Sequence, residues 1–285
     1  MPLIRYSQEP NLRFLWLASN MKTRTKVILG IIAGVVLFGP FAIPVRTSGT
    51  LSNKKAAALC WGRESQFVDI ADHSVHLVTR GDPACDTLIV LLHGFGASSL
   101  TWKEVLEPLS AVGFVVAYDR AAFGFTERPS EIGEINPYSA SGQLQVLDEI
   151  IEKYGAQKKI VVVGHSAGGS LALGYALDNP NKVDKLILEA PAVYGFNGAP
   201  EWLNRIFDIP QVDHLGPLAV SSIATSSLQV LNLSFFNKDL ITDQVIANYT
   251  APLAVLGWER AFLEFSRASR SPRLEERLGE LIVET

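Results

Sequence analysis

Residues 160–169, IVVVGHSAGG, decide the fold of this 285-residue chain. The apolar, mostly β-branched start predicts a buried strand, and the strand ends abruptly in the pattern Gly-x-Ser-x-Gly. Glycines at 164 and 168 suit a turn that is too tight for side chains on either side of it. Such a turn holds the Ser166 hydroxyl at the strand's carboxyl end, beside backbone N–H groups that open the next helix. Ser166 is therefore the candidate nucleophile.

The composition limits the kinds of protein that this chain can be. Hydrophobic residues make up 48% and charged residues 19%, which excludes disorder for most of the sequence. A formal net charge of −4 gives no electrostatic reason to expect a nucleic-acid partner. No cysteine or histidine spacing is typical of a metal site, and no motif calls for a cofactor. Cys60 and Cys85 either form a disulfide or remain free thiols.

Residues 27–45 are uncharged and mostly apolar, and their number is close to the ~20 that span a bilayer. Cationic side chains precede them at Lys22, Arg24 and Lys26. This bias predicts a single-pass transmembrane helix with residues 1–26 in the cytoplasm and the catalytic domain on the other side. The membrane is thus one expected partner.

Two other interpretations of this apolar segment stay open. A cleaved signal peptide that starts at Met21 has the same charged and apolar regions. A buried core helix is the third interpretation. Residues 46–65 are expected to form a linker to the folded domain.

The remaining pattern predicts an α/β fold over residues 66–191. Strands alternate with helices, which indicates a doubly wound, mostly parallel sheet with helices on both faces. In such sheets ligands bind at the carboxyl ends of the strands, where Ser166 is expected. The expected strands are 66–70, 74–79, 87–92, 115–118, 160–165 and 185–189. The expected helices are 101–112, 140–154, with Ser139 as its N-cap and Gly155 ending it, and 168–178.

Residues 192–273 are helical in pattern and interrupted by prolines, which predicts an inserted helical cap over the active edge of the sheet. Residues 274–285 are expected to begin the return to the core. The cap contains aromatic side chains that would serve as apolar pocket walls, although most are expected to pack the cap's own interior. These are Trp202, Phe207, Phe235, Phe236, Trp258 and Phe262.

A second small-residue loop, His93-Gly94-Phe95-Gly96, directly follows a buried strand. In a parallel sheet this loop lies near the loop of the nucleophile. The backbone N–H groups of Phe95 and Ala167 are the expected oxyanion donors. His93 is expected to hold the loop by hydrogen bonds rather than to act as a base.

Together these motifs resemble the α/β-hydrolase fold superfamily, in the branch with a helical cap after the sixth strand. Residues 119–129, DRAAFGFTERP, and 136–139, NPYS, resemble further segments of that family. The resemblance implies a serine hydrolase that acts on a small-molecule acyl substrate without a cofactor. Asp119 and Arg120 are expected to form a salt bridge that pins a loop, the alternative being a charged pair near the pocket entrance. The His165 side chain is expected to point away from that of Ser166.

The family orders its catalytic residues as nucleophile, acid and histidine, but no histidine follows His214. The catalytic acid and histidine are therefore expected to be missing. Three explanations compete: a fragment of a longer protein, a natural truncation without catalysis, or another base such as His214. Glu189, at the end of the sixth strand, is the candidate acid, and the alternative is that it only lines the junction with the cap.

The expected function is hydrolysis of a carboxylic ester or a similar acyl substrate, with Ser166 as the nucleophile that attacks the carbonyl and takes up the acyl group. Two alternatives remain. One is a non-catalytic module that binds a small molecule, and the other is a cofactor-free haloperoxidase-type or carbon–carbon bond hydrolase. The sequence indicates no oligomeric state.

Overall fold

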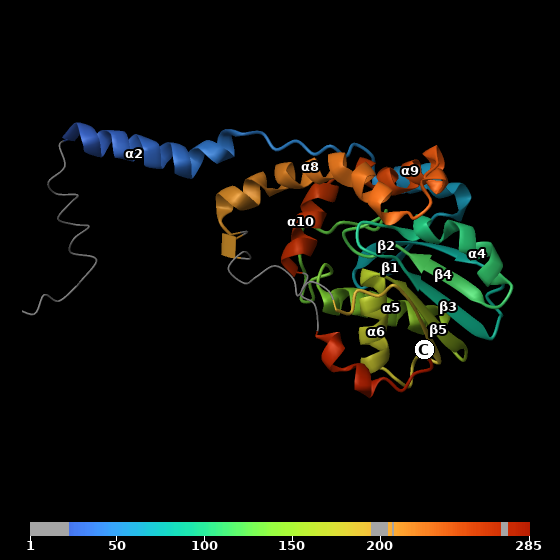
Figure 1. The fold of residues 1–285 in the computed structure, drawn as a ribbon. Helices are drawn as coiled ribbons and strands as arrows, with labels where there is room; N and C mark the ends of the chain where they lie inside the picture. The colour runs from blue at the N-terminus through green and yellow to red at the C-terminus, as the bar shows by residue number, and fades with distance from the viewer. Residues whose placement is uncertain (1–22, 195–204, 207, 269–272) are drawn as a thin grey trace, which may run out of the picture.

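The computed structural model describes residues 23–194, 205–206, 208–268 and 273–285, without the side chains of 223–228. Its centre is a six-stranded sheet in the order β1-β2-β4-β3-β5-β6, with helices on both faces (Figure 1). The predicted α/β class is confirmed. The strands are β1 (Gln66–Ile70), β2 (His73–Arg80), β3 (Thr87–Leu92), β4 (Phe114–Tyr118), β5 (Lys159–His165) and β6 (Lys185–Glu189).

The sheet is parallel where the site is expected and antiparallel at its other end. β3 pairs in parallel with both β4 and β5, and β5 pairs in parallel with β6. The hairpin of β1 and β2 joins β4 in the antiparallel sense. The carboxyl ends of β3, β4, β5 and β6 therefore lie along one edge.

Two apolar clusters, one on each face, hold the helices to the sheet. Their helices are α4 (Lys103–Ser110), which follows the short turn η3 (Ser99–Trp102), α5 (Ala140–Tyr154) and α6 (Ala167–Asp178). The boundaries of α5 are those expected from the sequence. The Ser139 side chain accepts a hydrogen bond from Gly142 N–H, and Gly155 ends the helix.

Residues 46–65 are not a linker, and that expectation is corrected. They contain α3 (Asn53–Trp61) and the turn η2 (Gly62–Glu64), and Ala56, Ala57 and Trp61 are buried in one of the core clusters. Ser52 caps α3 by accepting from Lys55 N–H. The sequence gives little sign of this helix, because α3 has only nine residues and two of its three buried side chains are alanines.

Among the described residues of the expected cap region, the long helices are α8 (Pro210–Ser234), α9 (Asp243–Thr250) and α10 (Trp258–Ala268), with the short turns η4 (Lys238–Leu240) and η5 (Ala251–Ala254) between them. Residues 48–51, here called the strap, run beside the start of α10. Ser48 N–H and Oγ–H both donate to Glu259 Oε1, at 2.5 and 2.7 Å. Leu51 pairs in parallel with Val255, so the strap joins the N-terminal region to the cap.

The apolar N-terminal segment forms α2 (Thr23–Phe38) and continues as the turn η1 (Gly39–Ala42). Together they make a helix of 20 residues with a hydropathy of 2.0, long and apolar enough to cross a membrane. This helix projects from the rest of the molecule, and none of its residues is buried (Figure 1). The interpretation as a buried core helix is therefore wrong, while a membrane span and a signal sequence both fit.

The last described residues run back to the sheet after the turns η6 (Leu274–Glu276) and η7 (Leu278–Glu280). Glu284 forms a parallel bridge with Lys185, and Leu186 N–H donates to Glu284 O at 2.8 Å. This contact lies on the outer edge of β6 and buries Val283.

Candidate active site

Ser166 occupies a strained turn between β5 and α6. Its φ of 51° and ψ of −119° lie in a region that side-chain-bearing residues rarely adopt. The turn closes only because its flanking residues are glycines. A Cβ on Gly164 would lie 2.6 Å from Gly168 O, and a Cβ on Gly168 would lie 2.4 Å from Leu92 O.

The backbone of Ser166 is fixed on both sides of the turn. Its N–H donates to Glu189 O at 3.0 Å, and its carbonyl accepts from Ala192 N–H at 3.0 Å. The side chain is partly exposed. No described residue forms a hydrogen bond with the Ser166 hydroxyl, so it is open to an incoming group.

The loop 93–96 lies directly against this turn. A Cβ on Gly94 would lie 3.2 Å from Ser166 Cβ and 2.9 Å from His165 Nδ1. Within the described part of the chain, the N–H groups of Phe95 and Ala167 donate to no loop carbonyl and to no side chain. Ala167 is also the first residue of α6, so its N–H has no acceptor within the helix. Two unengaged amide donors therefore flank the serine.

His93 holds this loop in place and is not a base. Its Nε2 accepts from Arg120 N–H at 3.0 Å, which leaves the hydrogen on Nδ1 to donate to Gly94 O at 2.8 Å. Complete burial, followed by the charge of Arg120, lowers the pKa of His93 from 6.5 to about 3. The ring is therefore neutral at physiological pH, in agreement with the structural role expected.

Asp119 and Arg120 do not pair with each other, which corrects the expected salt bridge. Asp119 Oδ2 lies 2.8 Å from His76 Nδ1. The Asp119 carboxylate also accepts hydrogen bonds from the backbone N–H groups of Ser99 in η3 and of Phe125. Arg120 donates to Gln143 Oε1 at 2.8 Å and to Gly94 O at 3.1 Å. Both side chains pin loops, but through different partners.

Burial opposes ionisation of Asp119, yet the charge and hydrogen bond of His76 outweigh it and hold the pKa of Asp119 below its ordinary value. Because Asp119 is ionised, His76 presents Nδ1–H to it. The other ring nitrogen, Nε2, lies 3.1 Å from Ser65 Oγ.

The sequence did not reveal this chain of contacts, in which Ser65, His76 and Asp119 are linked as serine, histidine and acid are in a catalytic triad. The side chains of His76 and Asp119 are fully buried. Ser65 precedes β1, and the sheet order separates β1 and β2 from β5 by two strands. The arrangement lacks the tight turn and small-residue loop that flank Ser166, and it is best explained as a structural hydrogen-bond chain.

Of the other two candidates, the acid Glu189 lies next to the Ser166 turn, whereas the base His214 contacts the N-terminal helix. Glu189 ends β6 in register with His165, its backbone bonded to Ser166 and its side chain exposed. His214 lies elsewhere, with Nε2 3.0 Å from Ile43 O and its ring 5.2 Å from that of Phe41. Its contacts are therefore with the N-terminal helix and give no support to its recruitment as a base.

A cluster of aromatic rings joins the loop 93–96 to the cap. The Phe95 ring lies 5.7 Å from Phe123 and 5.3 Å from Phe262, and Phe265 lies 4.8 Å from Phe123. α10 therefore sits over the carboxyl ends of β3 and β4. Of the expected pocket walls, Phe262 lies here, Trp258 is buried, Phe235 is partly exposed and Phe236 is fully exposed, while Trp202 and Phe207 are outside the described residues.

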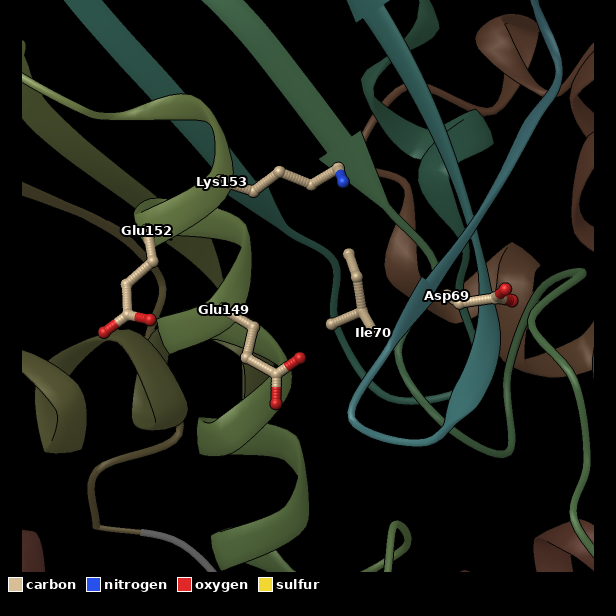
Figure 2. A pocket seen from close by; sticks show the side chains of 5 residues that line it. All are labelled: Asp69, Ile70, Glu149, Glu152 and Lys153. Carbon is tan, nitrogen blue, oxygen red and sulfur yellow. The ribbon is translucent and has the colours of Figure 1, made fainter.

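A surface hollow of about 560 Å³ is lined by Asp69, Ile70, Glu149, Glu152 and Lys153 (Figure 2). It lies between α5 and the hairpin of β1 and β2, where Glu149 Oε2 accepts from Ala71 N–H at 2.7 Å. Its lining includes no residue of the Ser166 turn or of loop 93–96, so it is separate from the candidate active site.

No group of three or more potential metal ligands occurs within the described ranges. Cys60 and Cys85 are both free, so the disulfide alternative is wrong. Burial is the main cause that raises the pKa of the Cys60 thiol.

Comparison with known proteins identifies the class. The sequence profile described as the alpha/beta hydrolase fold matches residues 87–262, which include loop 93–96 and the Ser166 turn. The chain therefore belongs to the α/β hydrolase fold family.

Particular relatives are similar over part of their length. The chain is 35% identical over 220 residues to the 1-acylglycerol-3-phosphate O-acyltransferase ABHD5 of Rattus norvegicus, which covers 68% of this chain and 60% of the relative. It is 26% identical over 187 residues to the monoacylglycerol lipase abhd6-A of Xenopus laevis, covering 65% of this chain and 54% of the relative. The chain thus spans little more than half of each.

Solved structures agree on the fold alone. A hydrolase from Pseudomonas aeruginosa PA01 superimposes with a TM-score of 0.58 at 18% identity, over 77% of each chain. The epoxide hydrolase CorEH superimposes with a TM-score of 0.55 at 23% identity, over 72% of each chain.

Proposed function

We propose that this chain is a membrane-anchored serine hydrolase that acts on a carboxylic ester or a similar acyl substrate. One observation carries the proposal: the Ser166 hydroxyl stands at a strained turn, free of any described partner, with two unengaged amide donors beside it. The family membership and the names of the two relatives, both concerned with acyl groups, support the same chemistry.

In the proposed reaction Ser166 Oγ attacks the acyl carbonyl and its proton passes to a base, which gives a tetrahedral intermediate. The N–H groups of Phe95 and Ala167 hold the new oxyanion, each contributing about 3 kcal/mol of transition-state stabilisation. As the intermediate collapses, the base returns the proton to the leaving oxygen, the alcohol departs and an acyl-enzyme remains. Water then hydrolyses the acyl-enzyme, which releases the acid and regenerates the Ser166 hydroxyl. A serine in this turn argues against epoxide hydrolysis, for which the superfamily uses aspartate.

Glu189 is the proposed acid, because the backbone hydrogen bond to Ser166 N–H places the end of β6 beside the nucleophile. No histidine among the described residues contacts the serine hydroxyl, and the base remains unassigned. That observation favours a second candidate, a module that binds an acyl compound in the same place without turning it over.

A fluorophosphonate probe discriminates between the two, because it reacts only with an activated serine. We expect the full-length protein in detergent to be labelled and Ser166→Ala to abolish labelling. Ser65→Ala is the matched control, since it removes a serine whose hydroxyl lies 3.1 Å from His76 Nε2, and it should retain labelling. An unlabelled folded protein would favour the binding module, and a label mapped to Ser65 would overturn the assignment.

A further inference from the structure

The cap and the N-terminal helix touch where that helix ends. Gln211 Nε2–H donates to Leu37 O at 3.0 Å, and His214 Nε2 lies 3.0 Å from Ile43 O. The last carbonyls of a helix lack intrahelical partners, and leaving them unbonded is costly away from water. Here side chains from the first turns of α8 satisfy two carbonyls at the end of this helical segment.

Exposed apolar side chains surround this junction. Phe38, Phe41 and Ile43 come from the end of the helix, and Ile206 and Ile209 come from the chain entering α8. These five residues, here called the collar, are between 37% and 71% exposed. The collar is therefore continuous with α2 in sequence through residues 38–43, and in space through the two hydrogen bonds.

From Val27 onward α2 is apolar on all sides, and the helix has no buried residue. A helix that lies flat on a membrane needs a polar face, which α2 lacks, so its composition suits a spanning orientation. If α2 spans the bilayer, the collar lies at the membrane–water interface. Large apolar side chains at that depth are stabilised by burial among lipids.

We infer that the collar is seated in the lipid interface, so that the cap, rather than the opposite edge of the sheet, faces the membrane. The inference rests on the proposed anchoring by α2. The strap strengthens it, because Ser48 ties the chain leaving α2 to Glu259 at the start of α10. α10 in turn contacts Phe95 beside the nucleophile, so the candidate active site lies on the membrane side of the domain.

The test places single cysteines in the full-length chain, with Cys60 and Cys85 replaced by alanine, and labels them with an environment-sensitive fluorophore. The protein is reconstituted in phosphatidylcholine nanodiscs that contain a lipid nitroxide quencher. The positions are Ile209→Cys for the collar, Ile32→Cys for α2, and Val112→Cys, an exposed apolar residue before β4 at the sheet edge opposite the cap.

We expect quenching at 209 to be several-fold greater than at 112 and to be accompanied by a blue-shifted emission. Ile206→Cys should behave as Ile209→Cys does, which guards against a local effect of one substitution. Replacing Gln211 and His214 with alanine should lower the quenching at 209 and leave that at 32 unchanged.

The possible failures are distinguishable. If position 32 is quenched while 206 and 209 match 112, the collar inference is overturned and the anchor stands. If position 32 itself is exposed to water, the proposed anchoring fails, and the collar inference fails with it.

Discussion

Gly168→Ala tests whether the Ser166 turn depends on the close approach of two backbones. The new Cβ would lie 2.4 Å from Leu92 O and 2.5 Å from His93 O, whereas ordinary contact begins at 3.4 Å. The end of β3 must therefore retreat by about 1 Å, and it carries loop 93–96 with it.

The magnitude follows from two opposing effects. Alanine gains up to ~1 kcal/mol over glycine in a helix, while overpacking against backbone costs ~1–3 kcal/mol. Since both contacts are with carbonyl oxygens that cannot rotate away, we expect the free energy of unfolding to fall by about 1–2 kcal/mol. A displacement of ~1 Å between reacting groups also costs ~100-fold in rate, so fluorophosphonate labelling should slow by a similar factor.

The matched control is Gly174→Ala, in the same helix. Its Cβ would meet only Leu274 Cδ2, at 3.7 Å, so this variant should be as stable as the wild type or up to ~1 kcal/mol more stable. Urea unfolding in detergent, followed by circular dichroism, measures both variants. If Gly168→Ala proves no less stable than Gly174→Ala and labels at the wild-type rate, the packing argument is refuted.

Three further outcomes are expected. Asp119→Asn should lower the free energy of unfolding by ~3–5 kcal/mol, because the buried His76 loses its carboxylate partner. In the wild type the pKa of Asp119 is lowered on folding, so its contribution to stability is present above pH 3.8 and is lost as pH falls through the folded pKa. The variant should lack this loss of stability at acid pH, and a variant whose stability falls with pH as the wild type's does would contradict the reasoning. The pKa of His93 falls from 6.5 to about 3 on folding, so stability should be complete above 6.5 and decline as pH falls toward 3, and His93→Gln should flatten urea-midpoint profiles in that window. Glu259→Ala should lower the free energy of unfolding by ~1–3 kcal/mol, because it removes two hydrogen bonds worth ~0.5–1.5 kcal/mol each. It should also speed limited proteolysis of the strap, whereas an unchanged cleavage rate would show that the strap is held elsewhere.

Patterns local to the chain predicted most of the sheet. The run 87–92 and the run before Ser166 are buried on both faces, so their apolar residues are continuous in sequence, and Ser139 and Gly155 bracket α5 by their own backbone preferences. The Ser166 turn was equally visible as the local pattern Gly-x-Ser-x-Gly, although only Gly164 is required by a neighbour in sequence, Gly168 O, whereas Gly168 is required by Leu92 O at the end of β3.

Features that depend on distant partners were not predictable in this way. Ala56 and Ala57 are buried because α3 packs on the sheet, and a short segment that contains alanines gives no sequence pattern from which this packing could be predicted. His76 and Asp119 are 43 residues apart, and nothing near either residue indicates the other. Phe236 and Trp258 are both aromatic residues of the cap region, yet one is fully exposed and the other buried, since only tertiary packing distinguishes them.

The strap has a consequence for biosynthesis. Ser48 and Glu259 are separated by 211 residues, so Ser48 cannot make these hydrogen bonds until the ribosome has reached α10. At ~5–20 residues per second this interval is roughly 10–40 s. During that time α2 and the chain behind it must be handled by the insertion and folding machinery without the contact that later joins them to the cap.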